Sequence, residues 1–250
     1  MTANLSRRTV LRRAALIAAG ATVGSQVLAT PGYAASGKPD PAALRKALKT
    51  AQQKVKDREA HVLSGARSKN GWDMEKVVDD RGNVYTRSVS GTPLDVQVRM
   101  GDVETILAHV ISRFHYEIDT LRKGDVVGWR RPGSVRKGLP ESNQASGTAV
   151  QIRPGSYPSG LRGGFYPLEE LTIRDILADA EGVVRWGGDD RAPDESLFYI
   201  DVRPDDARLT KVAEKIRTWT FTPGQGSGVL VDPLQSQRRK AAERLASQQA

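Results

Sequence analysis

Two short stretches of the chain gather the polar residues whose types and spacing could do chemistry. Residues 142–155 read Ser-Asn-Gln-Ala-Ser-Gly-Thr-Ala-Val-Gln-Ile-Arg-Pro-Gly, a turn-rich loop that runs into a short apolar strand. Residues 185–200 contain Arg-Trp-Gly-Gly-Asp and then the acidic pair Asp194 and Glu195. Hydroxyls and carboxylates in such positions could supply a nucleophile, a general base or metal ligands.

Several of these chemistries lack a necessary partner. Ser142 and Ser146 are possible nucleophiles, but neither stretch holds a His to activate them. Carboxylates between residues 189 and 195 leave a Ca²⁺ site or a glycosidase-like pair open, although loop carboxylates beside a Gly turn commonly serve neither role. Thiol chemistry is excluded because the chain has no Cys, and phosphate-loop, dinucleotide-binding, Gly-x-Ser-x-Gly and His-Glu-x-x-His patterns are absent.

The spacing in the first stretch resembles the signature of the zinc D-Ala-D-Ala carboxypeptidase family, Ser-x-His-x-x-Gly-x-Ala-x-Asp. That family shares its fold with lysostaphin-type endopeptidases and the hedgehog signalling domain. Ser142, Gly147 and Ala149 match the signature. Gln144 stands where the family has its His ligand, and Gln151 where it has its Asp ligand.

The second stretch matches the other half of the family's pattern. Asp194 falls at the general-base position, and Leu197 replaces the third zinc ligand. Zinc binds imidazole nitrogen, thiolate or carboxylate oxygen, whereas a Gln amide is a weak donor and Leu is none. The resemblance covers about residues 104–202 and therefore implies a relative without a bound metal or other cofactor.

The resemblance also implies a ligand-binding groove. Gly128-Trp129-Arg130 matches a Gly-aromatic-Arg segment that places an Arg over the substrate, so Arg130 is the implied clamp and Arg131 the alternative. A planar guanidinium suits a carboxylate because it donates two parallel hydrogen bonds. Ser142, Asp194 and Trp186 are implied to line the same groove. A surface Arg and a core Trp remain the alternative interpretations.

These residues are compatible with three functions. The resemblance implies first a non-catalytic module that binds a cell-wall peptide or a related extended peptide. The second hypothesis is a residual or altered peptidoglycan hydrolase that uses Asp194, and the third is a purely structural extracellular protein. No nucleic-acid partner is predicted.

The first 34 residues have the pattern of a twin-arginine signal peptide. Arg7 and Arg8 form the twin pair, and the apolar run at residues 14–29 is too short and too rich in small residues to span a membrane. Cleavage after Ala34 predicts a secreted or cell-wall protein without a stable membrane span, an uncleaved anchor being the alternative. Without the four arginines of this segment the net charge falls from +9 to +5, which favours solubility or an anionic cell wall.

The expected fold is α+β, a small antiparallel sheet flanked by helices, as in the hedgehog/DD-peptidase fold. Residues 35–65 are predicted to be a linker and an N-terminal helix from Pro41, whose basic face either contacts an anionic surface or is simply solvated. Residues 66–221 are predicted to form the peptidase-like domain, and residues 222–250 a flexible C-terminal tail.

Within the domain, the periodicity of apolar residues predicts each element. A hairpin is expected between residues 74–78 and 84–89, followed by a third strand at 94–100. Helices are expected at 103–114, 167–180 and 205–219, and strands at 149–152, 183–186 and 196–202, the last two paired antiparallel. On the first helix, Arg113 and Glu117 are predicted to pair, and His109 and His115 to lie on different faces.

Overall fold

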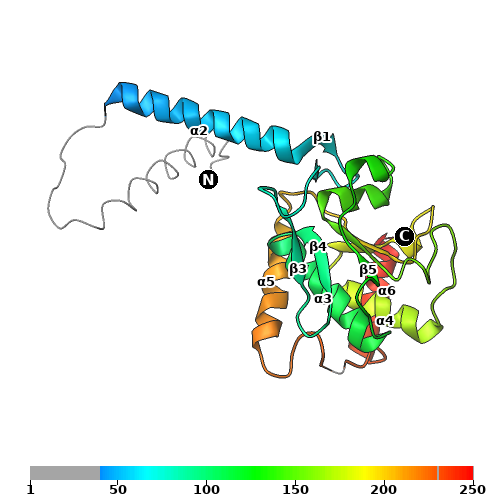
Figure 1. Cartoon of the computed structure of the whole chain (residues 1–250). Coiled ribbons are helices and arrows are strands. Elements are labelled where there is room, and N and C mark those ends of the chain that lie inside the picture. The colour runs from blue at the N-terminus through cyan, green and yellow to red at the C-terminus, as the bar shows by residue number, and fades with distance from the viewer. Residues whose placement is uncertain (1–39, 230, 250) are drawn as a thin grey trace. The chain divides into compact units, whose positions relative to one another are not determined.

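The computed structural model describes residues 40–229 and 231–249 (Figure 1). The predicted signal peptide, residues 1–34, and the lead-in that follows it lie outside this part of the chain. The chain divides into two units, the first ending at Ala60 and the second beginning at His61. Within the described ranges, each helix is either too short or too polar to cross a membrane.

The first unit contains the predicted N-terminal helix, α2 (Pro41–Val62). Asp40 caps this helix by accepting a hydrogen bond of 3.0 Å from the backbone N–H of Ala42, and Pro41 occupies the first helical position. Every residue from Pro41 to His61 is exposed. The helix is confirmed, and its charged and apolar side chains alike face solvent.

The second unit is mixed α/β, with small antiparallel sheets flanked by helices, as expected. Strand β1 (Leu63–Arg67) pairs with β2 (Asp73–Glu75), and β3 (Val84–Ser88) pairs with β4 (Asp95–Arg99). The largest sheet has the order β5-β6-β8-β7 and is antiparallel throughout. Its strands are β5 (Val126–Val127), β6 (Ala149–Ile152), β8 (Leu197–Ile200) and β7 (Val184–Trp186).

Four helices complete this unit: α3 (Asp102–Glu117), α4 (Pro167–Asp179), α5 (Ala207–Phe221) and α6 (Ser236–Gln249). Three short 3₁₀ helices, η1 (Pro132–Ser134), η2 (Pro140–Ser146) and η3 (Gly187–Asp189), shape the loops beside the large sheet. The predicted central strand, the antiparallel pair β7 and β8, the strand at β4 and the helices α3, α4 and α5 are all confirmed, within one to three residues at their ends.

The two faces of the large sheet have different coverings. Side chains alternate along a strand, so Val150, Phe198 and Trp186 share one face, and they join the main apolar core with α3, α4 and α5. Ala149, Leu197 and Tyr199 lie on the other face and form a separate small cluster. The helix η2 contacts β6 and β8. Only the first face is thus part of the main core.

The predicted hairpin between residues 74–78 and 84–89 is wrong. β2 pairs with β1, and β3 pairs with β4, in register from Val84 opposite Arg99 to Ser88 opposite Asp95. The cause is the buried carboxylate of Glu75, which accepts hydrogen bonds from the backbone N–H groups of Asn83 and Val84 at 2.8 and 3.1 Å. This side chain takes donors that a β2–β3 ladder would have used.

The predicted flexible tail also differs from the structure, because its last part is the docked helix α6. Figure 1 shows α6 beside α4, and the two helices pack together. Ala242 and Leu245 of α6 are buried. Arg238 reaches the carboxylates of Asp175 and Asp179 on α4, with Nη2 2.7 Å from Asp175 Oδ2. Gln249, near the end of α6, also donates to the carbonyl of Val184 at 3.1 Å. The polar composition of α6 concealed this docking, because polar side chains make most of its contacts.

The same carboxylates bind a buried arginine of α3. Arg113 is 1% exposed and contacts Asp175 at 2.8 Å, Asp179 at 2.7 Å and Glu117 at 2.6 Å. The predicted pair of Arg113 with Glu117 is confirmed, but it belongs to a buried network rather than to a helix surface. This network ties α3, α4 and α6 together at one point.

Candidate functional site

The residues at the three positions that the resemblance assigns to metal ligands, Gln144, Gln151 and Leu197, gather around one row of the large sheet. Gln151 of β6 lies directly opposite Leu197 of β8, and on its other side opposite Val127 of β5. Directly opposed residues project to the same face of an antiparallel pair. Gln151 and Leu197 therefore lie side by side on the face of the sheet away from the main core.

Asp194 lies beside this row, because the loop before β8 folds back over it. Its Oδ2 accepts a hydrogen bond of 2.9 Å from Gln151 Nε2. Its Oδ1 accepts from the hydroxyl of Ser196 at 2.6 Å and from the Ser196 N–H at 3.2 Å. Asp194 is 6% exposed and Gln151 7%. Asp194 is thus held in place at both oxygens and largely withdrawn from solvent.

The side chain of Gln144, from η2, contacts the same row by hydrogen bonds to backbone carbonyls of β5 and the residue after it. Its Nε2 donates to the carbonyl of Val127 at 3.1 Å and to that of Gly128 at 2.9 Å. Both N–H groups of the amide are therefore used to hold β5 and the loop that follows it. Gln144, Gln151 and Leu197 thus all contact the row that runs from β5 to β8.

The residues present at these positions do not fit a zinc ion. Gln144 and Gln151 use their amide nitrogens as hydrogen-bond donors, and Leu197 has no donor atom. Their amide oxygens are buried and have no donor among the described residues. Across the described ranges, His, Cys, Asp and Glu side chains form no group of three that could hold a metal. Gln144 and Gln151 therefore offer hydrogen-bond donors and acceptors at these positions.

Basic side chains rim this site on the loop after β5. Arg130 is half-buried and Arg131 exposed, and neither side chain forms a hydrogen bond or ion pair within the described part of the chain. Arg136 forms a two-pronged pair with Glu141, with Nε–Oε1 at 2.9 Å and Nη2–Oε2 at 2.8 Å. The hydrogen bond to Glu141 raises the pKa of Arg136, and the nearby charge of Asp194 adds to the effect. The loop therefore lies near Asp194.

Glu141 links this rim to Arg130. The hydrogen bond from Arg136 lowers the pKa of Glu141 against the effect of partial burial, and the charge of Arg130 contributes to the lowering. Arg130 thus lies near Glu141 without a hydrogen bond to it. Its guanidinium keeps its donors available to a ligand.

Ser142, the fourth predicted contact, has a structural role. It is fully buried; its hydroxyl donates to the carbonyl of Leu139 at 2.6 Å and accepts from the N–H of Lys69 at 2.9 Å. Its neighbour Asn143 accepts from the N–H of Asn70 at 3.1 Å. These bonds join η2 to the 68–72 turn. The structure does not bring the Ser142 hydroxyl to the surface of the site.

Asn70 is a residue that the sequence did not single out. Its side chain donates to Thr148 Oγ1 at 2.9 Å and to the carbonyl of Ile200 at 2.7 Å. Ser146 bonds to Thr148 and to Ser68 in the same buried group, at 2.9 and 3.0 Å. Hydroxyls and amides spread over two distant segments carry no local pattern, so this group could be found only from the fold.

Trp186 lies on the opposite face of the sheet from Gln151 and Leu197. It is 3% exposed, and its indole N–H donates to the carbonyl of Glu195 at 2.8 Å. Gly188 is needed for this packing, because a Cβ at that position would lie 2.4 Å from the Trp186 ring. Trp186 is therefore largely buried, and it lies on the other face of the sheet from Gln151 and Leu197.

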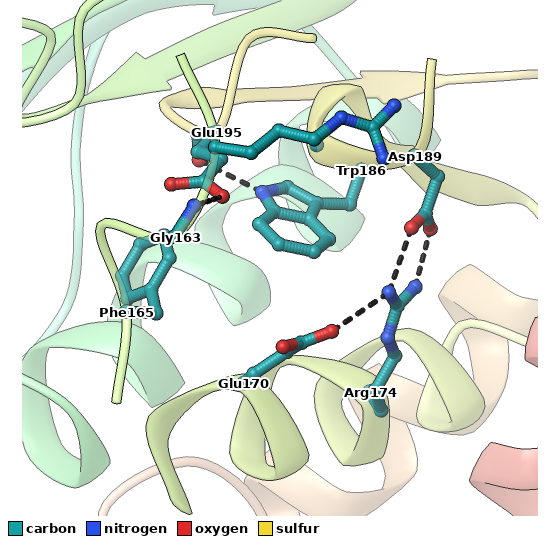
Figure 2. A pocket seen from close by; sticks show the side chains of 9 residues that line it. Gly163, Phe165, Glu170, Arg174, Trp186, Asp189 and Glu195 are labelled. Atoms are coloured by element: carbon teal, nitrogen blue, oxygen red, sulfur yellow. Dashed lines mark hydrogen bonds and ion pairs between the residues drawn. The ribbon is translucent and has the colours of Figure 1, made fainter. Parts of the chain in front are cut away.

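A pocket of about 170 Å³ opens beside Trp186. Figure 2 shows the indole ring in its middle, with Phe165 and Glu195 on one side and Arg174 and Asp189 on the other. Phe165 meets the indole edge to face at 5.9 Å, and the Arg174 guanidinium lies 5.0 Å from the ring centre. The walls are thus aromatic and charged.

Each charged side chain of this pocket is already engaged. Arg174 bonds to Asp189 at 2.7 Å and to Glu170 at 3.0 Å, and the Glu195 carboxylate accepts from the N–H groups of Gly163 and Gly164 at 2.7 and 2.8 Å. Arg162 donates to the carbonyl of Asp190 at 2.8 Å. The predicted calcium or glycosidase-like use of these carboxylates finds no free pair here. In the sequence, the pair of consecutive glycines Gly163 and Gly164 is the only feature that relates to their hydrogen bonds with Glu195.

Comparison with protein-family models, with curated proteins and with solved structures found no match to this chain.

Proposed function

We propose that the protein is an exported, non-catalytic relative of the zinc D-Ala-D-Ala carboxypeptidases that binds the carboxyl end of a cell-wall peptide. In this proposal the large sheet is that of the hedgehog/DD-peptidase fold. Arg130 is the group that receives the peptide carboxylate. Asp194, Gln144 and Gln151 shape the floor beneath it.

The observation that carries the proposal is the meeting of Gln144, Gln151 and Leu197 around one sheet row. Three positions that are 53 residues apart at their extremes in the sequence contact the same row, with Asp194 bonded to one of them. The ligand spacing of the resembling family requires such a meeting. The residue types found there favour binding over hydrolysis.

Arg130 supports the choice of ligand. It is partly exposed, lies at the rim of the row and makes no bond within the described chain, whereas Arg136 is committed to Glu141. A free guanidinium can form two charge-assisted hydrogen bonds with a carboxylate, each worth about 1.5–3 kcal/mol. A peptide that ends in a free carboxylate therefore has a specific partner here.

Calorimetric titration with a short peptide ending in D-Ala-D-Ala tests this function. The free acid should bind, and the matching C-terminal amide should bind at least about tenfold more weakly, since about 1.4 kcal/mol of binding free energy corresponds to a factor of ten. Arg130→Ala should weaken binding of the acid by about 10–100-fold. Arg131→Ala is the matched control and should leave it within about twofold of wild type.

The result also separates the competing functions. Equal binding of acid and amide, or an equal loss for both Arg variants, would exclude Arg130 as the clamp. Release of free D-Ala during the titration would support the altered-hydrolase hypothesis instead. If neither peptide binds at any concentration, the binding function is wrong and the hypothesis of a purely structural protein remains.

A further inference from the structure

Helix α2 presents an apolar stripe that no part of the described chain covers. Leu44, Leu48 and Val55 are 45–48% exposed, and Ala51 lies between them in the sequence and is exposed too. Their spacings are four, three and four residues, so they occupy successive d, a, d and a positions of a heptad repeat. Such a stripe is the seam of a two-stranded coiled coil rather than the broad face of a globular helix.

From this stripe we infer that α2 is a self-association element, in which two copies of the chain pair through a parallel coiled coil of their α2 helices. In proteins most helical stability comes from packing of an apolar face rather than from propensity, so a partner along the seam stabilises α2. The partner is a second copy because the charges that flank the stripe are complementary to themselves.

Lys54 and Glu59 carry that complementarity. With Leu48 and Val55 at a, Lys54 falls at a g position and Glu59 at the following e position. In a parallel pair, each g residue faces the e residue five positions later on the other helix, so Lys54 faces Glu59 of the other copy twice by symmetry. On its own helix Lys54 is five residues from Glu59, and these two side chains point in different directions. Neither forms an ion pair within the described residues of one chain.

The composition of the stripe disfavours a membrane surface as the occupant. Interfacial helices bury Trp, Phe or Leu on a wide apolar face, whereas this stripe has two Leu, one Val and one Ala and no aromatic residue. Lys46, Lys49 and Lys56 lie on the side of the helix opposite the stripe, where a membrane at the stripe would leave them in water.

The seam is short, so the association is weak. Arg58 occupies the next d position and ends the apolar run after less than two heptads. A polar residue at a core position fixes register at a cost in stability. We therefore expect a monomer–dimer equilibrium that shifts with concentration rather than a permanent dimer.

Analytical ultracentrifugation of the secreted protein over a dilution series tests the inference. The mean mass should rise from monomer toward dimer with concentration. Lys54→Glu and Glu59→Lys should each abolish this rise, because each places like charges across the seam. An equimolar mixture of the two variants should associate at least as well as wild type, since both facing pairs then become opposite in charge.

A cysteine experiment tests the parallel geometry, and the chain has no Cys to interfere. Ala51→Cys at the seam should form a disulfide-linked dimer under mild oxidation, because equal d positions meet in a parallel pair. Gln53→Cys on the far side of the helix is the control and should stay monomeric. A wild-type monomer at every concentration, or equal cross-linking of both Cys variants, overturns the inference. Tighter binding of Glu59→Lys to anionic vesicles without self-association would assign α2 to a surface instead.

Discussion

At the scale of residues, the site depends on which atoms of Gln151 and Asp194 meet. The family resemblance implied that Asp194 and Gln151 lie in one region, and the structure places their side chains in hydrogen-bond contact. The sequence could not predict that Gln151 donates to Asp194, nor that Ser142 is buried under the 68–72 turn. Those contacts depend on side chains from segments that are distant in the sequence.

The Gln151–Asp194 bond allows a test at this scale. Gln151→Glu replaces the N–H donor with a second carboxylate at the same place, and two carboxylates this close cannot both ionise without cost. The free energy of unfolding should fall by about 1–3 kcal/mol at neutral pH. The stability deficit of the variant should shrink on acidification. In the folded variant one of the two carboxyl groups holds a proton more tightly than in the unfolded chain, so protonation at low pH stabilises the folded state.

Urea unfolding of wild type and variant at neutral and mildly acidic pH measures this difference. Gln151→Met is the matched control, because it removes the hydrogen bond without adding charge. Its deficit should narrow less on acidification than that of the Glu variant, because it loses one hydrogen bond to the Asp194 carboxylate but adds no second charge. Identical pH profiles for the Glu and Met variants would show that Gln151 and Asp194 are not in contact in solution.

At the scale of elements, the strands β6, β7 and β8 and the helices α3, α4 and α5 were predictable because each carries a clear apolar period. The pairing of β2 and the docking of α6 could not be predicted, because both depend on contacts that buried carboxylates make with distant residues. The Glu75 carboxylate redirects β2, and the Asp175–Asp179 pair receives Arg238 from α6. An isolated acidic or basic residue on a helix has the same appearance in the sequence whether its partner is water or a distant side chain.

Docking of α6 is tested by replacing Arg238, a partly buried cation whose side chain is 27% exposed. Arg238→Ala should lower the free energy of unfolding by about 3 kcal/mol, the low end for one partner of a buried pair, because Arg113 still contacts Asp175 and Asp179. Arg239→Ala, next in sequence, removes only an exposed pair with Glu243 and should change stability by less than about 0.5 kcal/mol. Equal thermal stability of both variants would show that α6 does not dock through Arg238.

Acid should weaken the same contact. Burial alone would raise the pKa of Asp179, but His109 at 3.6 Å and the charges of Arg113 and Arg238 lower it by more, so its pKa lies below the ordinary value. A carboxylate with a lowered folded-state pKa contributes stability above its unfolded pKa, about 3.9, and loses it as the pH falls through the folded value. The stability difference between Arg238→Ala and wild type should therefore narrow below about pH 4.

At the scale of the whole molecule, the mixed α/β class and the small antiparallel sheet followed from composition and periodicity. The proposed descent of the site from a zinc site rests on the spacing of Gln144, Gln151 and Leu197, because no family model, curated protein or solved structure matches the chain. The structure shows one arrangement: Gln144, Gln151 and Leu197 contact the row that runs from β5 to β8, and Asp194 lies beside this row. In the function proposed above, this arrangement is the frame of a lost zinc site.

Zinc content of one triple variant measures that claim most directly. Gln144→His, Gln151→Asp and Leu197→His together place two imidazoles and a carboxylate at the three positions, which is the ligand set of an open zinc site. Because the surrounding partners that orient such ligands have changed, binding should be about 10–100-fold weaker than in a natural site. The double variant without Leu197→His is the control for incomplete ligation.

Elemental analysis after dialysis against zinc gives the result, with a cooperative thermal transition as proof of folding. The account predicts about one zinc per folded chain for the triple variant, clearly less for the double variant and none for wild type. A folded triple variant without zinc would show that the three positions do not converge. Stoichiometric zinc in wild type would contradict the loss of the site itself.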